Sequence, residues 1–503
     1  MALQLYNTLS RSLEDFQPIE PGKVRIYVCG MTTYDYCHIG HARAMMSFDV
    51  VVRYLRHAGY EVTYVRNHTD VDDKIIARAA ELGEPPLALS ARFIDALDQD
   101  LDALGLIRPD IAPKVSEHID GIVAMTATLV DKGHAYPADN GDVYFAVESF
   151  DRYGKLSGRK LDELRAGERV AVDPNKRNPG DFALWKGAKE GEVAWDSPWG
   201  PGRPGWHIEC SVMSSAHLGE RFDIHGGGID LIFPHHENEI AQSECAHGSH
   251  PMANHWMHNG HLSVVERDED GQWQQIKMSK SLGNVIRIRD VLAEMPAEAL
   301  RWVYVQSHYR SPLPYSAEAL QDAMATMSRV YEAKERATEI AAKEPKASAE
   351  QLAKESGAAK ELYALAAGFQ DAFNEAMDQD FNTAKASSLL LELVRTVNRL
   401  SNDKSMRKRG AALMAMVLGA FETSAKVLGI GGMDPEAFFA ELRDKQAKVR
   451  GLDTAWVEAQ LVARTQARTD KDWAAADQIR DALLDKGVQI MDNPSGVTWR
   501  VQL

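Results

Sequence analysis

Apolar residues near the start of the chain follow two successive patterns, which predict a strand and then a helix. Residues 26–28 form a β-branched and aromatic run that is typical of a buried strand, and it ends at Gly30 in a polar loop. From His41 to Leu55, apolar residues recur at helical spacing and predict one amphipathic helix. A second strand pattern follows at residues 61–67. We therefore expect a parallel βαβ unit at the start of an α/β domain.

The residue composition of the sequence changes several times after this unit, which indicates several domains. Many Gly, Pro and Trp residues between 109 and 205 exclude long helices and indicate a subdomain inserted between two halves of the α/β domain. Residues 1–22 are expected to form an irregular lead-in. The expected divisions are 1–108 and 206–260 for the two halves of the α/β domain, 109–205 for the insertion, 261–315 for a mixed region, 316–428 for a helical bundle, and 433–503 for a small α/β module.

Composition narrows the class of protein. A chain of 503 residues is too long for one core and corresponds to about three or four domains of ~150 residues. The formal net charge of −16 argues against general affinity for nucleic acid, so RNA contacts would rest on local basic patches such as Lys404, Arg407, Lys408 and Arg409. Four scattered cysteines do not make a disulfide framework. With neither a leader pattern nor a membrane-span pattern, we expect a cytoplasmic protein.

Two histidines at the start of the first predicted helix indicate a phosphate site. His38 and His41 are three residues apart, so both imidazoles can lie beside the N–H groups of the first turn. A glycine-rich GxGxxG loop is missing after the strand, which weakens a dehydrogenase interpretation. The run from His38 to His41 resembles the HIGH signature of nucleotidyl transferases and class I aminoacyl-tRNA synthetases. That resemblance implies an ATP-handling α/β domain.

A second basic motif follows far along the chain, at residues 277–281. Lys277 and Lys280 are three residues apart, with hydroxyl groups beside them and Gly283 after them. Such a loop can bring ammonium groups to a polyphosphate and stabilise the charge that builds on a leaving pyrophosphate. Its KMSKS sequence resembles the second signature of class I synthetases.

A third group of residues is of the kind that binds metals. His235 and Glu239 are four residues apart in a predicted helix, so their side chains share one face. Cys29 follows the first strand and Cys210 precedes the return to the sheet, although a buried cysteine is more often a small apolar side chain than a ligand. Competing ligands of the same chemical type are His236, Glu237 and Cys245. Asp70, Asp72 and Asp73 fill the first turn of another predicted helix and are interpreted mainly as capping residues.

Six runs taken together resemble the cysteinyl-tRNA synthetases, over nearly the whole chain. They are YVCGMTTYDYCHIGHAR, NHTDVDDKI, KRNPGDFALWK, GRPGWHIECS, DIHGGGIDLIFPHHENEIAQ and KMSKSLGN. The resemblance implies a Rossmann-type parallel-sheet catalytic domain with an inserted subdomain, followed by an α-helical bundle and a small C-terminal module. The polar segment at residues 266–275 is longer than is usual in the family.

The same resemblance assigns site residues by position. It implies one zinc ion per chain, held by Cys29, Cys210, His235 and Glu239. It implies that His38, His41 and Lys280 bind ATP and that Asp230 lies near the ribose. We expect Lys277 and Mg²⁺ to act with them in stabilising the transferring phosphates. It also implies that Trp206 and Thr69 line the amino-acid pocket.

The implied activity is that of a cysteine–tRNA ligase, which activates L-cysteine with ATP to cysteinyl-adenylate and transfers it to tRNA(Cys). Region 261–315 would then carry the KMSKS loop and contact the tRNA stem, the bundle would bind tRNA, and the C-terminal module would bind the anticodon. We expect a monomer without membrane contacts. Two alternatives are a cysteine amide ligase of mycothiol synthesis, which joins cysteine to an amino sugar, and a non-catalytic RNA-binding paralogue.

Overall fold

The centre of the molecule is a parallel four-stranded sheet. In the computed structural model, which describes all residues except 1, 160–173, 190, 249–250, 277–283 and 494–495, the strand order is β10-β9-β3-β4. The strands are β3 (Lys23–Val28), β4 (Glu61–Arg66), β9 (Phe222–Gly228) and β10 (Ala253–Asn259). Helix α1 (Ile39–His57) joins β3 to β4 and buries its apolar side chains. The expected βαβ unit is therefore confirmed.

The lead-in before β3 is more regular than we expected. Strands β1 (Gln4–Asn7) and β2 (Ser12–Asp15) pair as an antiparallel hairpin, so the prediction of an irregular segment is wrong. Leu5 is fully buried, and the carboxylate of Asp380 accepts a hydrogen bond from the backbone N–H of Tyr6 at 2.9 Å. Contacts from distant parts of the chain thus stabilise a hairpin that its own short strands did not predict.

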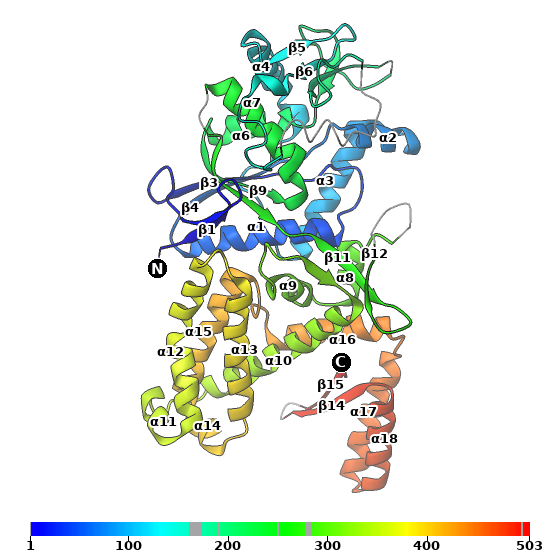
Figure 1. Cartoon of the computed structure of the whole chain (residues 1–503). Coiled ribbons are helices and arrows are strands. Elements are labelled where there is room, and N and C mark those ends of the chain that lie inside the picture. Colours follow the sequence, from blue (N-terminus) through cyan, green and yellow to red (C-terminus); the bar gives the residue numbers. More distant parts are fainter. Residues whose placement is uncertain (1, 160–173, 190, 249–250, 277–283, 494–495) are drawn as a thin grey trace.

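Between β4 and β9 the chain forms helices and then a second sheet. Its elements are α2 (Asp73–Leu82), α3 (Pro86–Ala103), α4 (Ile119–Asp131), β5 (Ala135–Pro137), β6 (Val143–Phe145), β7 (Phe182–Gly187), β8 (Gly202–Pro204) and α6 (Ile208–Leu218). Strands β5 to β8 pair antiparallel in chain order. This part lies above the central sheet in Figure 1, and Trp185 is buried within it.

The polar segment at residues 266–275 forms most of a second hairpin. Strands β11 (Leu262–Arg267) and β12 (Trp273–Ile276) pair antiparallel, and β13 (Leu313–Tyr315) pairs with β11 on its other side. Helices α7 (Glu237–His247), α8 (Ile288–Glu294) and α9 (Ala297–Val305) complete this half of the molecule.

A helical bundle lies below the central sheet (Figure 1). Its members are α10 (Ala317–Ala341), α11 (Ala349–Glu355), α12 (Gly357–Asp378), α13 (Thr383–Leu400), α14 (Lys404–Arg409) and α15 (Ala411–Leu428). Helix α15 is apolar and long enough to span a membrane, but about half of it is buried, against α10 and α12 among others, as in the core helix of a bundle. Within the basic patch, Arg409 pairs with Glu355 at 2.6 Å.

The end of the chain forms a small unit with its own core. Helices α16 (Pro435–Val449), α17 (Thr454–Thr469) and α18 (Trp473–Asp485) precede the hairpin β14 (Val488–Asn493) and β15 (Gly496–Val501). Trp499 and Val457 belong to its apolar core, which is separate from the core of the bundle.

The strand order determines where a ligand can bind at the edge of the central sheet. From β3 the chain crosses to β4 on one side, while β9 lies on the other side of β3 and leads to β10. Crossovers that leave in opposite directions open a crevice at the carboxyl ends of the two central strands. Cys29 follows β3 directly, and Gly228 ends β9. The crevice therefore lies beside the start of α1.

Candidate active site and metal centre

His38 caps the helix that begins at this crevice. Its Nδ1 atom accepts hydrogen bonds from the backbone N–H groups of Gly40 at 3.1 Å and His41 at 3.3 Å. The His38 and His41 rings stack with centroids 3.6 Å apart. We expected the N–H groups of the first turn to bind a phosphate. The structure corrects this expectation, because the N–H groups of Gly40 and His41 donate to the imidazole of His38 instead. With Nδ1 accepting, Nε2 carries the proton of the neutral ring.

The fold brings together two cysteines that are far apart in the sequence. Cys29 lies just beyond β3, and Cys210 lies in the first turn of α6. Their sulfur atoms are 3.6 Å apart, with the thiol of Cys29 as the donor. Both are free cysteines, and Cys210 is buried. The end of a β-strand and the start of a helix thus present two sulfur ligands to one point.

Two further ligands meet the cysteines from the segment after β9. His235 lies in a turn over Ile232–His236, and Glu239 lies in the first turn of α7. The Oε1 atom of Glu239 is 3.0 Å from Nε2 of His235 and 3.5 Å from the sulfur of Cys29. One ligand atom from each of Cys29, Cys210, His235 and Glu239 lies within 4.8 Å of all the others. Two sulfurs, an imidazole and a carboxylate form a set of donors that suits zinc.

The charges within the cluster prepare it for a cation. Hydrogen bonds from Cys29 and His235 lower the pKa of the Cys210 thiol to about 6, in spite of its burial. Burial and the neighbouring Cys210 raise the pKa of Cys29 well above its usual value. His225 and His235 hold the pKa of Glu239 well below its usual value, against the effect of burial. Against the effect of burial, Glu239 and Cys210 raise the pKa of His235 to about 10. Near neutral pH the cluster therefore contains a thiolate, a carboxylate and an imidazolium, and the imidazolium must lose its proton when a cation binds.

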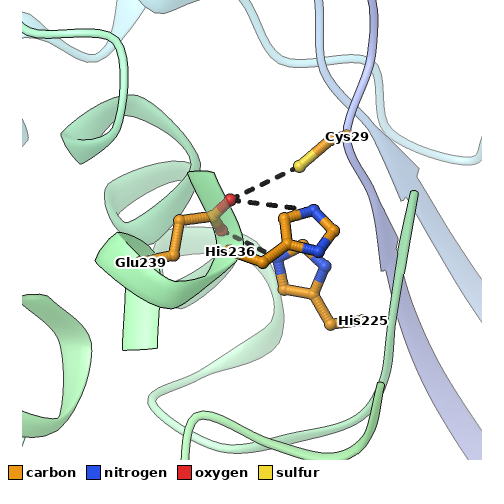
Figure 2. Close-up of side chains that lie close together, drawn as sticks. All are labelled: Cys29, His225, His236 and Glu239. Atoms are coloured by element: carbon orange, nitrogen blue, oxygen red, sulfur yellow. Dashed lines mark hydrogen bonds and ion pairs between the residues drawn. The ribbon is translucent and has the colours of Figure 1, made fainter. Parts of the chain in front are cut away.

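A second group of possible ligands overlaps the first. Cys29 and Glu239 also lie within 4.8 Å of ligand atoms of His225 and His236. Figure 2 shows these four side chains close together. The two groups differ in access. Cys29, Cys210 and His235 line a cavity of about 460 Å³ at the crevice, whereas His225 and His236 are fully buried and do not line it. Three residues of the first group line the cavity, whereas in the second group Cys29 alone does, so an ion held by the first group lies nearer to a ligand in that cavity.

His225 is a site residue that the sequence did not identify. Its Nε2 atom is 2.7 Å from Oε2 of Glu239, on the side of the carboxylate away from His235. A partner of this kind orients a ligand carboxylate. The sequence signal was a histidine directly before three glycines, in the strand run FDIHGGG. His207 also contacts a ligand residue and was not identified from the sequence: its Nδ1 lies 3.0 Å from Nδ1 of His235.

The competing candidates have other contacts. The Oε2 atom of Glu237 accepts hydrogen bonds from the backbone N–H groups of Leu156 at 3.1 Å and Ser157 at 2.7 Å. Cys245 lies outside both ligand groups, and burial raises its pKa to about 12. His236 is 2.8 Å from His258 and lies 4.0 Å from Glu239.

The three aspartates at the start of α2 have different hydrogen-bond and ion-pair partners. Asp72 caps the helix by accepting from the N–H of Lys74 at 2.8 Å, as we predicted. Asp70 instead accepts from the backbone N–H of Ser116 at 3.0 Å. Asp73 pairs with Lys186 at 2.7 Å and also with Arg203.

The other predicted site residues fall on the walls of the same cavity. His38, His41, Thr69, Trp206 and Asp230 all line it. The indole of Trp206 stacks on the imidazole of His235 with centroids 4.4 Å apart. The hydroxyl of buried Thr69 donates to Glu209 at 3.4 Å. Lys277 and Lys280 lie outside the described residues.

Models of three protein families match successive parts of the chain. The class I (C) catalytic domain of tRNA synthetases matches residues 15–325, the DALR domain matches residues 372–430, and the cysteinyl-tRNA ligase anticodon-binding domain matches residues 454–500. The last of these favours the full ligase over the two alternatives raised from the sequence.

Curated relatives match over the full length. The chain is 52% identical over 501 residues to the cysteine–tRNA ligase of Alkalilimnicola ehrlichii, and the alignment covers 99% of each chain. It is 51% identical over 498 residues to the cysteine–tRNA ligase of Thioalkalivibrio sulfidiphilus, again covering 99% of each.

Solved structures with low identity share the fold. Methionyl-tRNA synthetase of Mycobacterium tuberculosis, in complex with methionyl-adenylate, has a TM-score of 0.60 at 15% identity and covers 81% of this chain and 92% of its own. A leucyl-tRNA synthetase of Agrobacterium radiobacter K84, in a ternary complex with tRNA, has a TM-score of 0.58 at 11% identity and covers 85% of this chain and 86% of its own.

The class I catalytic fold and the full-length relatives therefore agree with the sequence resemblance. The chain belongs to the cysteine–tRNA ligases, which are ATP-dependent class I aminoacyl-tRNA synthetases.

Proposed function

We propose that Cys29, Cys210, His235 and Glu239 hold one zinc ion and that the cavity beside them binds L-cysteine. Two observations support this proposal: the ligand atoms lie within 4.8 Å of one another, and three of the four residues line the cavity. Bound zinc would supply an open coordination position for the sulfur of the substrate. In the other ligand group Cys29 lines the cavity, but His225 and His236 do not.

The chemistry of the donors explains the choice of amino acid. Cysteine and serine differ by one atom, which shape alone separates poorly in a small pocket. Zinc prefers a thiolate over a neutral hydroxyl, so a sulfur-binding position separates the two at the binding step. Trp206 and Thr69 would complete the pocket, since both line the cavity. A separate editing site is then unnecessary.

The adenylate would form at the start of α1. The carboxylate of cysteine attacks the α-phosphorus of ATP, and pyrophosphate leaves. His38 and His41 would meet the phosphates, with Nε2–H of His38 as donor because its Nδ1 accepts from the helix. Asp230 lines the same cavity and would bind the ribose. Lys277, Lys280 and Mg²⁺ would balance the charge on the leaving group.

The second step would transfer the cysteinyl group to the 2′-hydroxyl of the terminal adenosine of tRNA(Cys). The bundle and the C-terminal module would hold the stem and the anticodon, a division that the match to an anticodon-binding domain supports. We expect this reaction to proceed in the cytoplasm, on a monomer.

The metal assignment is tested by substituting one ligand. Zinc content and cysteine-dependent exchange of pyrophosphate into ATP are measured for the parent protein and for Cys210→Ala. We expect the variant to lose zinc and its preference for cysteine over serine. Cys245→Ala is the matched control, because Cys245 is also a buried cysteine but lies outside the cluster. Equal zinc in the parent and in Cys210→Ala would overturn the assignment.

A further inference from the structure

Glu209 carries a buried carboxyl group that the proposed mechanism does not use. It lies in the first turn of α6, directly before the metal ligand Cys210, and it is only 1% exposed. It nevertheless lines a cavity of about 960 Å³, which adjoins the active-site cavity and shares Thr32, Lys74 and Trp206 with it. The carboxyl group therefore lies at the edge of the space that a ligand can enter.

This carboxyl group has no positively charged partner within the described part of the chain. Glu239, the other buried glutamate of the site, pairs with His225 and His235. Burial and the neighbouring Cys210 raise the pKa of Glu209 well above its usual value, which is the direction expected for a carboxyl group that faces no cation. Buried carboxylates are normally paired, because an unpaired buried charge is costly. A cationic group of a ligand would supply the missing partner.

Hydrogen bonds connect Glu209 to the wall of the active-site cavity. The hydroxyl of Thr69, which lines that cavity, donates to Oε2 of Glu209 at 3.4 Å. The same hydroxyl oxygen accepts from Nδ2 of Asn67 at 3.4 Å, and Oδ1 of Asn67 accepts from the backbone N–H of Gly30 at 2.8 Å. One lone pair of the Thr69 oxygen then remains for a ligand. Because its proton is directed to Glu209, Thr69 can only accept from that ligand, and the ligand must donate.

These groups lie close to the metal ligands. Glu209 and Cys210 are consecutive residues, and Sγ of Cys210 is 3.9 Å from Oδ1 of Asn67, the residue that donates to Thr69. In cysteine a single CH₂ group separates the sulfur from the α-carbon, so a substrate whose sulfur meets the metal holds its ammonium group near the cluster. An ammonium group has one positive charge and three N–H donors, which suit an acceptor oxygen beside a carboxylate.

We propose that Glu209 and Thr69 bind the α-ammonium group of cysteine, with Glu209 supplying the opposite charge and Thr69 an acceptor oxygen. The inference rests on the proposed function, because it adds a contact to an amino acid that is bound at the metal. The metal selects the sulfur of the substrate, and Glu209 selects the amino group beside it. A thiol without an ammonium group therefore binds weakly, even though the metal accepts its sulfur.

The test compares three thiols that differ in charge. They are cysteine, 3-mercaptopropionate, which lacks the ammonium group, and cysteamine, which lacks the carboxylate. Their dissociation constants are measured by titration calorimetry with the zinc-loaded parent and with zinc-loaded Glu209→Gln. We expect the variant to bind cysteine and cysteamine about a hundredfold more weakly, because the buried charge opposite the ammonium group is lost. Its binding of 3-mercaptopropionate should not weaken, because that ligand has no group for Glu209 to contact.

Two further variants accompany this comparison. Glu244→Gln is the matched control, because Glu244 is also a buried glutamate but lines neither cavity, and it should bind all three thiols as the parent does. Thr69→Val removes the hydroxyl and keeps the shape of the side chain. It should bind cysteine about tenfold more weakly and leave the binding of 3-mercaptopropionate unchanged. Zinc content should be the same in the parent and in all variants.

Equal weakening toward all three thiols in Glu209→Gln would show that Glu209 only supports the shape of the pocket, and it would overturn the proposal. Unchanged binding of cysteine would do the same. The parent gives a test that needs no variant, since it should bind cysteine about a hundredfold more tightly than 3-mercaptopropionate. Equal binding of these two ligands would contradict the role of Glu209. A parent that holds no zinc would instead contradict the proposed function.

Discussion

One buried arginine, Arg301, forms hydrogen bonds across the junction between helix α1 and the bundle. Its Nη2 atom donates to Oδ2 of Asp49 on α1 at 2.7 Å and to the carbonyl of Leu428, at the end of α15, at 2.9 Å. Its Nη1 atom lies 3.3 Å from the carbonyl of Gly105. Arg301 and Asp49 are each only 2% exposed. We predict that Arg301→Met weakens the attachment of α1, α9 and α15 to one another.

The expected loss of stability depends on the groups that Arg301→Met leaves without their partner, which are the carboxylate of Asp49 and the carbonyl of Leu428. Breaking a buried ion pair by removing one partner costs about 3–5 kcal/mol, because the remaining charge is uncompensated. Asp49 keeps a hydrogen bond from Arg53 at 2.9 Å and one from the N–H of Ile107 at 2.8 Å. The expected loss is therefore at the lower end, about 3 kcal/mol. The carbonyl of Leu428 loses its guanidinium donor and contributes to that cost.

Amide hydrogen exchange measures this loss locally, without assuming that the whole chain unfolds in one step. Peptides from α1, α9 and the end of α15 should exchange about two orders of magnitude faster in Arg301→Met. Arg399→Met removes an arginine from an exposed ion pair with Glu361 and should change exchange little. Adding Asp49→Asn to Arg301→Met should recover part of the protection, because no buried charge is then left. Unchanged exchange in α1 would refute this reasoning.

Three further predictions concern the catalytic domain. Prolonged chelation should abolish cysteine-dependent pyrophosphate exchange, and added zinc should restore it; full activity of metal-free protein would contradict the proposed centre. Burial, assisted by Arg66, lowers the pKa of His68 from 6.5 to about 4, so between these pH values the unfolded chain binds a proton that the folded chain does not. Stability should therefore decrease as the pH is lowered, and His68 should contribute about 2 kcal/mol to this decrease near pH 5. In urea unfolding, His68→Gln should lessen the decrease. A Cβ atom at Gly226 would lie 2.3 Å from the ring of Phe48. Gly226→Ala should then lose about 1–3 kcal/mol, seen as a lower Tm, and added Phe48→Leu should restore part of it.

Local patterns in the sequence were enough to predict the regular elements of the catalytic unit. The strand at 26–28 and the helix after His41 depend on neighbours two to four positions away, and the structure has β3 and α1 there. The β1–β2 hairpin was missed because its short strands depend on distant contacts, including that of Asp380 with Tyr6.

For the candidate site, too, the sequence predicted some features and not others. The sequence alone identified the residue types and the motifs, and the resemblance to a family assigned a role to each site residue. No local pattern could show that Nδ1 of His38 turns back onto its own helix, or that His225 reaches Glu239. Both depend on rotamers set by packing.

The primary sequence by itself determined the elements, the order of the regions and the chemistry that they carry, because periodicity and motif are local properties. The tertiary structure alone decided which of those groups meet. Cys29 and Cys210 are adjacent because β9 pairs with β3 and α6 begins next to that pair, an arrangement that follows from strand order. The same packing leaves His235 at the cavity wall and buries His236 beneath it, although the two are neighbours in the chain.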